Sequence, residues 1–115
     1  KFEELKVWQR AIKFSEQAHD ITRTFPKEEL YILTAQFKRA ADSIALNIAE
    51  GSTGSTKKQF HSFLGHALRS AIECVSCIYV AKERSIISEV HFIMAYDELT
   101  VIIKMIQALR NSLKI

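Results

Sequence analysis

The stretch QFKRAADSIALNIAEG, residues 36–51, decides the fold that the sequence predicts. At helical spacing, three or four residues apart, one side of this stretch and of the residues before it is apolar. The apolar positions are Leu30, Leu33, Phe37, Ala41, Ile44 and Ile48. We therefore expect a core-facing helix over residues 27–50. It should end at Gly51, because glycine adopts the left-handed conformation that closes a helix.

The opposite side of the same stretch is polar. It consists of Gln36, Arg39, Ser43, Asn47 and Glu50. Serine and asparagine are poor helix formers at mid-helix positions, so another interaction should compensate for them. Two interpretations stay open: hydrogen bonds to a neighbouring helix, which we favour, or a contact surface for another subunit or a nucleic acid. With Gly51, these five residues are the structural or assembly motif that the sequence predicts.

Three further helices are predicted from end signals and apolar spacing. The first covers residues 3–23 and stops at the Phe-Pro pair that follows, since the residue before proline leaves the helical region. Another covers residues 56–83 and is capped by Ser55 or Thr56, of which Thr56 and a glutamine three residues later match a capping box. The last begins at the cap residue Ser88 and continues toward the end of the chain.

The composition supports a few long elements. The chain has 115 residues, of which 48% are apolar and 25% charged, as in ordinary globular proteins. It contains only 3 Gly and 1 Pro, too few for the many turns of a sandwich or barrel. Helices of this length with short connections predict an all-α, antiparallel up-and-down four-helix bundle, in a single domain over residues 1–115.

Charge and apolar patterning bear on partners and location. The formal net charge is +3 and the isoelectric point is near 9.0, which mildly favours an anionic partner. No apolar run approaches the roughly 20 residues that span a bilayer, so no membrane partner is expected. The charged, amphipathic start does not resemble a signal peptide, and we expect a cytoplasmic protein.

The first and last predicted helices carry more apolar positions than the bundle core requires. A core-facing helix of a monomeric bundle needs about three apolar positions per heptad. The surplus predicts a homo-oligomer. The alternative is a wide core side with scattered exposed aliphatic residues, which is common in monomers.

Motifs typical of catalysis or metal binding are incomplete. Cys74 and Cys77 match Cys-x-x-Cys but fall deep inside a helix, which favours two small buried residues over a redox pair. Glu16 and His19 have the Glu-x-x-His spacing of di-iron bundles, but no second copy exists. The segment 51–58 lacks the Gly-Lys-Ser/Thr order of a phosphate loop. We predict no catalytic residue, no metal and no cofactor, and hence no enzyme.

Exposed cations are the candidate binding residues. Lys57 and Lys58 follow a Ser/Thr-rich loop at a helix start, where backbone amides and basic side chains bind phosphate. The predicted nucleic-acid contacts are Lys6, Arg10, Lys13, Arg39, Lys57, Lys58 and Arg69. For any one cluster, the alternative is a solvated helix face. In a symmetric oligomer each cluster would repeat around a ring.

The stretches LKVWQRA (5–11), FPKEE (25–29) and RAADSIALNIAEG (39–51) resemble the four-helix-bundle family of 23S rRNA intervening-sequence proteins. KQF (58–60) and RSAIE (69–73) resemble its third helix. The family is bacterial and has no established biochemical activity. It is similar to the accessory variability protein of diversity-generating retroelements, a basic pentameric barrel that binds nucleic acid and its reverse transcriptase.

The resemblance implies a homopentamer and makes RNA or DNA an expected partner. Two features depart from the pattern: Arg69 stands where a small residue, usually Gly, is expected, and the net charge is lower than that of the retroelement protein. The favoured function is a non-enzymatic oligomer that contacts nucleic acid. The alternatives are a scaffold that binds another protein and, third, a metal enzyme.

Overall fold

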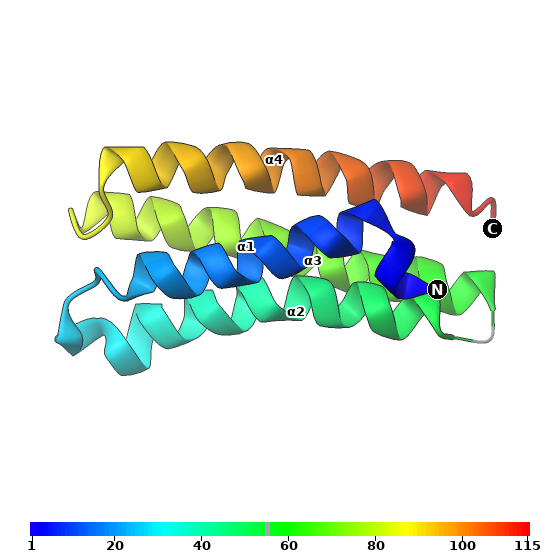
Figure 1. The fold of residues 1–115 in the computed structure, drawn as a ribbon, viewed down its shortest axis with the longest axis horizontal. Helices are drawn as coiled ribbons and strands as arrows, with labels where there is room; N and C mark the ends of the chain where they lie inside the picture. The colour runs from blue at the N-terminus through cyan, green and yellow to red at the C-terminus, as the bar shows by residue number, and fades with distance from the viewer. Residues whose placement is uncertain (55) are drawn as a thin grey trace.

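The structure is a computed structural model that describes residues 1–54 and 56–115. The described residues form four α-helices: α1 (Lys6–Thr22), α2 (Ala35–Ser52), α3 (Lys57–Glu83) and α4 (Glu89–Ser112). They run alternately up and down in one bundle (Figure 1). Both chain ends and the α2–α3 connection lie at one end of the bundle, and the other two connections lie at the opposite end (Figure 1). The predicted all-α, antiparallel four-helix bundle is confirmed.

One apolar core runs between the four helices. Each helix contributes large side chains that are fully buried, which stabilises the fold because apolar surface leaves water. They are Phe14, Ile21, Phe37, Ile44, Ile48, Leu64, Ile78, Leu99, Ile102 and Ile106. Fully buried alanines lie between them, among them Ala11, Ala18, Ala41, Ala67 and Ala71. Such small residues let neighbouring helices approach closely.

The chain enters α1 later than predicted. Residues Phe2–Glu4 form a 3₁₀ turn (η1), and Leu5 is extended before α1 begins at Lys6. The ring of Phe2 packs edge-on against Trp8, with 5.2 Å between ring centroids. The Gln9 side chain donates a hydrogen bond to the Glu3 carbonyl oxygen at 2.8 Å. These contacts fold the first residues back along α1 instead of extending it.

The second predicted helix is interrupted at its start. The structure has a 3₁₀ turn at Lys27–Glu29 (η2), a π-helical turn at Leu30–Thr34 (η3), and then α2. A π turn holds an extra residue, so side chains before it no longer follow the stripe of the helix after it. Leu30 is accordingly 46% exposed, and its predicted place in the core stripe is wrong. The other five stripe positions are buried as predicted.

Gly51 is required for a reason other than the predicted one. It lies within α2, no glycine of the described chain has a positive φ, and α2 continues to Ser52. A Cβ at Gly51 would lie 2.6 Å from the Phe63 Cβ and 3.0 Å from the Phe60 ring, both on α3. The predicted left-handed helix end is therefore wrong. Glycine is present because α2 and α3 come too close here for a side chain.

The starts of α3 and α4 have the predicted caps. The Thr56 hydroxyl accepts a hydrogen bond from the Gln59 backbone N–H, and the Ser88 hydroxyl accepts one from that of His91. The end of α3 uses a Schellman motif, in which the Ile86 N–H donates to the Ala81 carbonyl and the Ser85 N–H to that of Lys82. Ser85 takes the left-handed position, at φ 59°, that glycine usually fills. The predicted Ser55 alternative for the α3 cap lies outside the described residues.

One described helix, α3, is long and apolar enough to cross a membrane on length and composition alone. The sequence prediction that no such segment exists does not hold by this measure. Eight residues of α3, including Leu64, Ala71 and Ile78, are buried among the other helices. The same composition is found in core helices, and that is the position of α3 in this bundle.

Candidate nucleic-acid interface

Three of the seven candidate cations gather in a cleft between α1 and α4. The cleft has a volume of about 440 Å³ and is lined by Lys6, Gln9, Arg10, Lys13, Gln17, Glu98 and Met105. Residues 6, 10, 13 and 17 lie three or four positions apart and therefore share one side of α1. We call this site the cation cleft.

An ion pair crosses the cation cleft. Arg10 donates from Nε and Nη2 to the two carboxylate oxygens of Glu98, each at 2.9 Å. The hydrogen bond to Glu98 and the carboxylate charge raise the pKa of Arg10 above its ordinary value. Two parallel bonds of this kind fix the guanidinium plane. Arg10 therefore joins α1 to α4, while Lys6 and Lys13, which have no ion pair within the described chain, remain available to an anion.

Two buried polar side-chain atoms lack partners within the described residues. They are Gln17 Oε1 on α1 and His91 Nδ1 on α4. Gln17 also lines the cation cleft. Buried polar atoms are normally paired with protein or water, so Gln17 adds a polar group to the wall of the cleft.

Lys57 and Lys58 lie apart from the cation cleft, in the first turn of α3. Both side chains are exposed. They are at the end of the bundle that also carries the two chain termini (Figure 1). Within the described chain neither lysine has an ion-pair partner, so both can contact phosphate.

Arg39 and Arg69 belong to neither group. Arg39 is exposed on α2 and, within the residues described, makes no hydrogen bond or ion pair. Arg69 is exposed on α3 and donates from Nη2 to the His66 Nδ1 at 2.5 Å. The seven predicted contacts therefore form one cluster, one pair and two separate positions.

One residue on the polar side of α2, Gln36, forms a hydrogen bond to α3. The Gln36 amide donates to the Glu73 carboxylate of α3 at 3.3 Å. Asn47 instead bonds back to the Ser43 carbonyl of its own helix, at 2.8 Å. The side chains of Arg39 and Glu50 have no partner in the described chain. The favoured interpretation requires hydrogen bonds from Arg39, Ser43, Asn47 and Glu50 to a neighbouring helix, but within the described chain none of these four side chains makes one, and the subunit-contact alternative stays a prediction.

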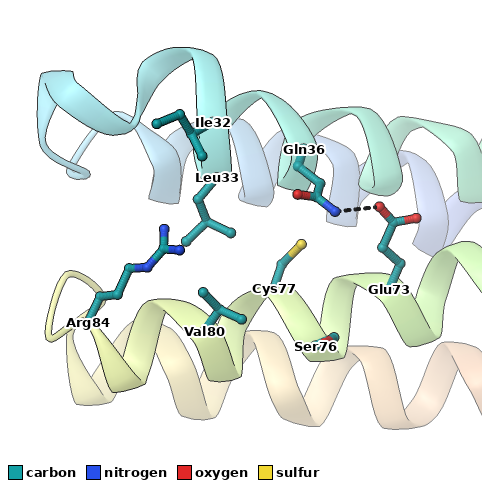
Figure 2. A pocket seen from close by; sticks show the side chains of 8 residues that line it. All are labelled: Ile32, Leu33, Gln36, Glu73, Ser76, Cys77, Val80 and Arg84. Carbon is teal, nitrogen blue, oxygen red and sulfur yellow. Dashed lines mark hydrogen bonds between the residues drawn. The ribbon is translucent and has the colours of Figure 1, made fainter.

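A groove of about 190 Å³ lies between the π turn, α2 and α3. Its lining comprises Ile32, Leu33, Gln36, Glu73, Ser76, Cys77, Val80 and Arg84 (Figure 2). Arg84 closes one end by an ion pair to Glu29, with its Nη1 at 3.0 Å from Oε1. The Cys77 thiol points toward this groove (Figure 2). We call it the α2–α3 groove.

Both cysteines are free and buried inside α3, as predicted. Burial raises the pKa of Cys77 to about 11, with a smaller contribution from the Glu73 charge. Burial likewise raises the pKa of Cys74. Both thiols are thus protonated at neutral pH, whereas a redox or nucleophilic cysteine needs a lowered pKa.

His19 is a hydrogen-bonded histidine at the α1–α2 interface. Its Nε2 lies 3.2 Å from the Asp42 Oδ1, to which the Ser15 hydroxyl also donates at 2.5 Å. Aspartate stands between the serine and the histidine, so the histidine has no contact through which it could activate the hydroxyl. Within the described residues, no three His, Cys, Asp or Glu side chains converge in a way that could hold a metal ion.

The surplus apolar surface lies on α4, as predicted, and also on η3 and α3, but not on α1. Of the large apolar side chains of α1, only Ile12 is exposed, because Leu5 and Trp8 pack against the core. The exposed α3–α4 strip consists of Ile72, Tyr79, Ile93 and Tyr96. The Tyr79 ring packs edge-on against Phe92 at 5.1 Å and Tyr96 at 6.2 Å.

The sequence analysis missed Arg110 and Glu98. Arg110 lies over Gly65, where a Cβ would be 3.0 Å from Nη2, and its Nε donates to the His61 carbonyl oxygen at 3.2 Å. A glycine inside a helix was the available signal, since it often marks close approach by another group. Glu98 could have been found as an acid bordering the apolar side of α4, opposite the basic side of α1.

A family model described as 23S rRNA-intervening sequence protein matches residues 3–108. A solved structure, a protein of unknown function of the S23 ribosomal protein family from Bacteroides thetaiotaomicron, is similar to the chain. It has a TM-score of 0.85 at 19% identity, covering 91% of this chain and 95% of the other, and at that identity it supports the fold alone.

The comparison with curated proteins gives no match. The matched family is of unknown function and is not a known enzyme family. Its model covers nearly the whole chain, including α1, α2 and α3, α4 as far as residue 108, and the residues through which the resemblance was identified. The chain belongs to the 23S rRNA-intervening sequence protein family.

Proposed function

We propose that this protein is a non-enzymatic, self-associating helical bundle that binds RNA or DNA through exposed cations. The cation cleft carries the proposal, because three basic side chains of α1 converge there on one concave surface. Phosphate contacts supply most of the affinity of sequence-independent binding and need only exposed lysines and arginines at suitable spacing.

Within the cation cleft, the proposed roles of the residues differ. Lys6 and Lys13 are the phosphate contacts, since neither has an ion pair in the described chain. Arg10 is already neutralised by Glu98 and holds the two walls of the cleft together. Lys57 and Lys58 add a second contact region, and Arg39 and Arg69 contribute only where the oligomer brings them near the same polynucleotide.

Self-association is proposed to use the α3–α4 strip. Ile72 and Tyr79 are seven positions apart and thus share one side of α3, and Tyr96 meets Tyr79 from α4. Contiguous exposed apolar residues of this kind mark interaction surfaces, since water leaves them when a partner covers them. A homopentamer is the assembly that the family resemblance leads us to expect.

Fluorescence anisotropy with labelled RNA and DNA tests the binding. Affinity should fall steeply between about 50 and 200 mM salt, because bound phosphates release counterions. The variant Lys6→Gln/Lys13→Gln should bind more weakly than the native protein. Its control is Lys27→Gln/Lys82→Gln, which removes two exposed lysines outside the cleft. Absence of binding by the native protein at low salt would remove the proposed function.

Light scattering after size exclusion tests the assembly. The native protein should elute as an oligomer, and Tyr79→Ser/Tyr96→Ser should reduce its molar mass while circular dichroism shows an unchanged helix content. A matched control, Tyr31→Ser, alters an exposed tyrosine outside the strip. A native protein that is monomeric at working concentration contradicts this part of the proposal.

The α2–α3 groove supports a second candidate function, a scaffold that binds another polypeptide. Ile32 and Val80 border it, and Tyr31 beside it is 89% exposed, so apolar surface is available to a partner side chain. Charge reversal at Lys57 and Lys58 separates the two candidates. It should weaken nucleic-acid binding by about tenfold or more at low salt and leave polypeptide binding in this groove unchanged.

A further inference from the structure

The charge of this protein is divided unevenly along the bundle. A plane across the middle of the four helices divides the bundle into two halves. The half with both chain ends and the α2–α3 connection comprises residues 1–13, 44–70 and 101–115, and we call it the basic half (Figure 1). It has ten Lys and Arg against three Asp and Glu, a formal charge of +7. The acidic half comprises residues 14–43 and 71–100. It has six Lys and Arg against ten Asp and Glu, a formal charge of −4.

The cations of the basic half are available to a partner. Its one ion pair among the described residues joins Arg10 to Glu98 of the acidic half. Lys1, Lys57, Lys58 and Lys114 are exposed at the chain ends and at the start of α3, all at the same end of the molecule (Figure 1). Glu3, Glu4 and Glu50 are the acidic residues of this half, and the surplus of seven cations leaves its local potential positive, while the acidic half repels the same anion.

Exposed aromatic rings have the opposite distribution. Among the described residues, the exposed ones are Tyr31, Tyr79 and Tyr96, and all three belong to the acidic half. The large aromatic side chains of the basic half are partly buried: Phe2 packs against Trp8, and Phe60 packs against the core. Proteins that bind single strands stack bases on exposed aromatic rings next to a basic groove. The basic half has the cations but not the rings.

We infer that the basic end of the bundle binds the phosphate backbone of double-stranded nucleic acid, without base stacking and without sequence preference. This inference rests on the proposed function and specifies its partner. In a duplex the bases are stacked on one another and the phosphates are displayed on the outside, which suits a surface that offers charge alone. The acidic half points away from the duplex and leaves its apolar surface to protein contacts.

The dimensions and charges agree with this arrangement. The bundle is 23 by 20 Å in cross-section. A duplex carries one phosphate charge per roughly 1.7 Å of axis, so about a dozen phosphates pass an end surface of that width. Contacts from the four end lysines alone contribute about −3.6 to the slope of log K against log salt for one protomer, and contacts from Lys6 and Lys13 of the cation cleft would make the slope steeper.

The test compares duplex RNA, duplex DNA and the single strands of the same sequences, each labelled, over a salt series. The variant Lys57→Glu/Lys58→Glu changes the charge of the basic end by four. Its control, Lys27→Glu/Lys82→Glu, makes the same change with exposed lysines of the acidic half. Acidic residues suit the first turn of a helix, so the first variant should fold, and circular dichroism verifies this for both.

The expected result is that both duplexes bind more tightly than either single strand. The basic-end variant should lose about tenfold or more in affinity at low salt, and its slope should become shallower by about two. The control should change affinity by less than about threefold. Duplexes of scrambled sequence should bind equally.

Four other results would overturn the inference. Tighter binding of single strands would show that bases are contacted. Equal losses of affinity in the two charge variants would show that the basic end is not the binding site. Both results leave the proposed nucleic-acid function standing. No binding of any polynucleotide by the native protein removes the proposed function itself. If only the basic-end variant loses molar mass in solution, the opposite charges of the two halves serve end-to-end assembly instead.

Discussion

Replacing Gly51 by alanine should destabilise the protein, although the same change inside a helix normally stabilises. The intrinsic helical preference of alanine favours the substitution by at most about 1 kcal/mol. The new Cβ, however, would lie 2.6 Å from the Phe63 Cβ and 3.0 Å from the Phe60 ring. The Phe63 Cβ is fixed to the backbone, so α2 and α3 must separate. Overpacking of this kind costs about 1–3 kcal/mol, and we expect a net loss of about 1–2 kcal/mol.

Urea unfolding followed by far-ultraviolet circular dichroism measures this difference, at one fixed protein concentration because assembly contributes to stability. Gly65→Ala is the matched control. Its Cβ would meet only the guanidinium end of Arg110, at 3.0 Å, which can move aside. Gly65→Ala should therefore be neutral or slightly stabilising, in contrast to Gly51→Ala.

A third variant separates close packing from backbone conformation. In the left-handed conformation asparagine is tolerated better than alanine, so Gly51→Asn would then be the milder change. Close packing predicts the reverse order, since asparagine is larger. An unfolding free energy that rises in Gly51→Ala, or that falls less in Gly51→Asn than in Gly51→Ala, refutes the reasoning.

Three further predictions follow from the structure. Ser85→Gly should stabilise by about 0.5–1 kcal/mol, or about 2–4 °C in thermal unfolding, because Ser85 has φ 59°; no increase contradicts the left-handed turn. Ser88→Ala should destabilise by about 1 kcal/mol in the same assay, because it removes the hydroxyl that accepts from the His91 N–H; an unchanged midpoint means that the cap is not formed. Burial raises the pKa of Cys77 to about 11, so as pH rises the unfolded state loses the thiol proton before the folded state does. The free energy of unfolding should therefore fall between about pH 9 and 11, by up to about 1.4 kcal/mol per pH unit. A Cys77→Ala variant whose free energy of unfolding falls equally steeply contradicts this.

Most of the fold could be predicted because apolar spacing is a local signal. The stripe at Leu33, Phe37, Ala41, Ile44 and Ile48 is buried as expected, and the caps at Thr56 and Ser88 form. The errors occurred where tertiary packing overrides local preference. The π turn before α2, which exposes Leu30, has no residue type that signals it.

The candidate site was predicted less well, because a sequence does not show which surfaces face each other. Lys6, Arg10 and Lys13 share one side of α1 by spacing, and that much was predictable. The pairing of Arg10 with Glu98 joins residues 88 positions apart and depends on how α1 packs against α4. Gly51 was identified as important for the wrong reason, because the same residue serves left-handed turns and close helix contacts alike.

The position of the exposed tyrosines has a consequence for any ring of these bundles. In a cyclic oligomer every copy is related to the next by rotation about one axis, so all copies point the same way. The residues of the α3–α4 strip lie in the acidic half. If neighbouring copies contact one another along this strip, the basic ends of all copies lie on the same side of the ring. Such an assembly has two different faces, and one of them is a continuous positively charged surface to which a long anion could bind.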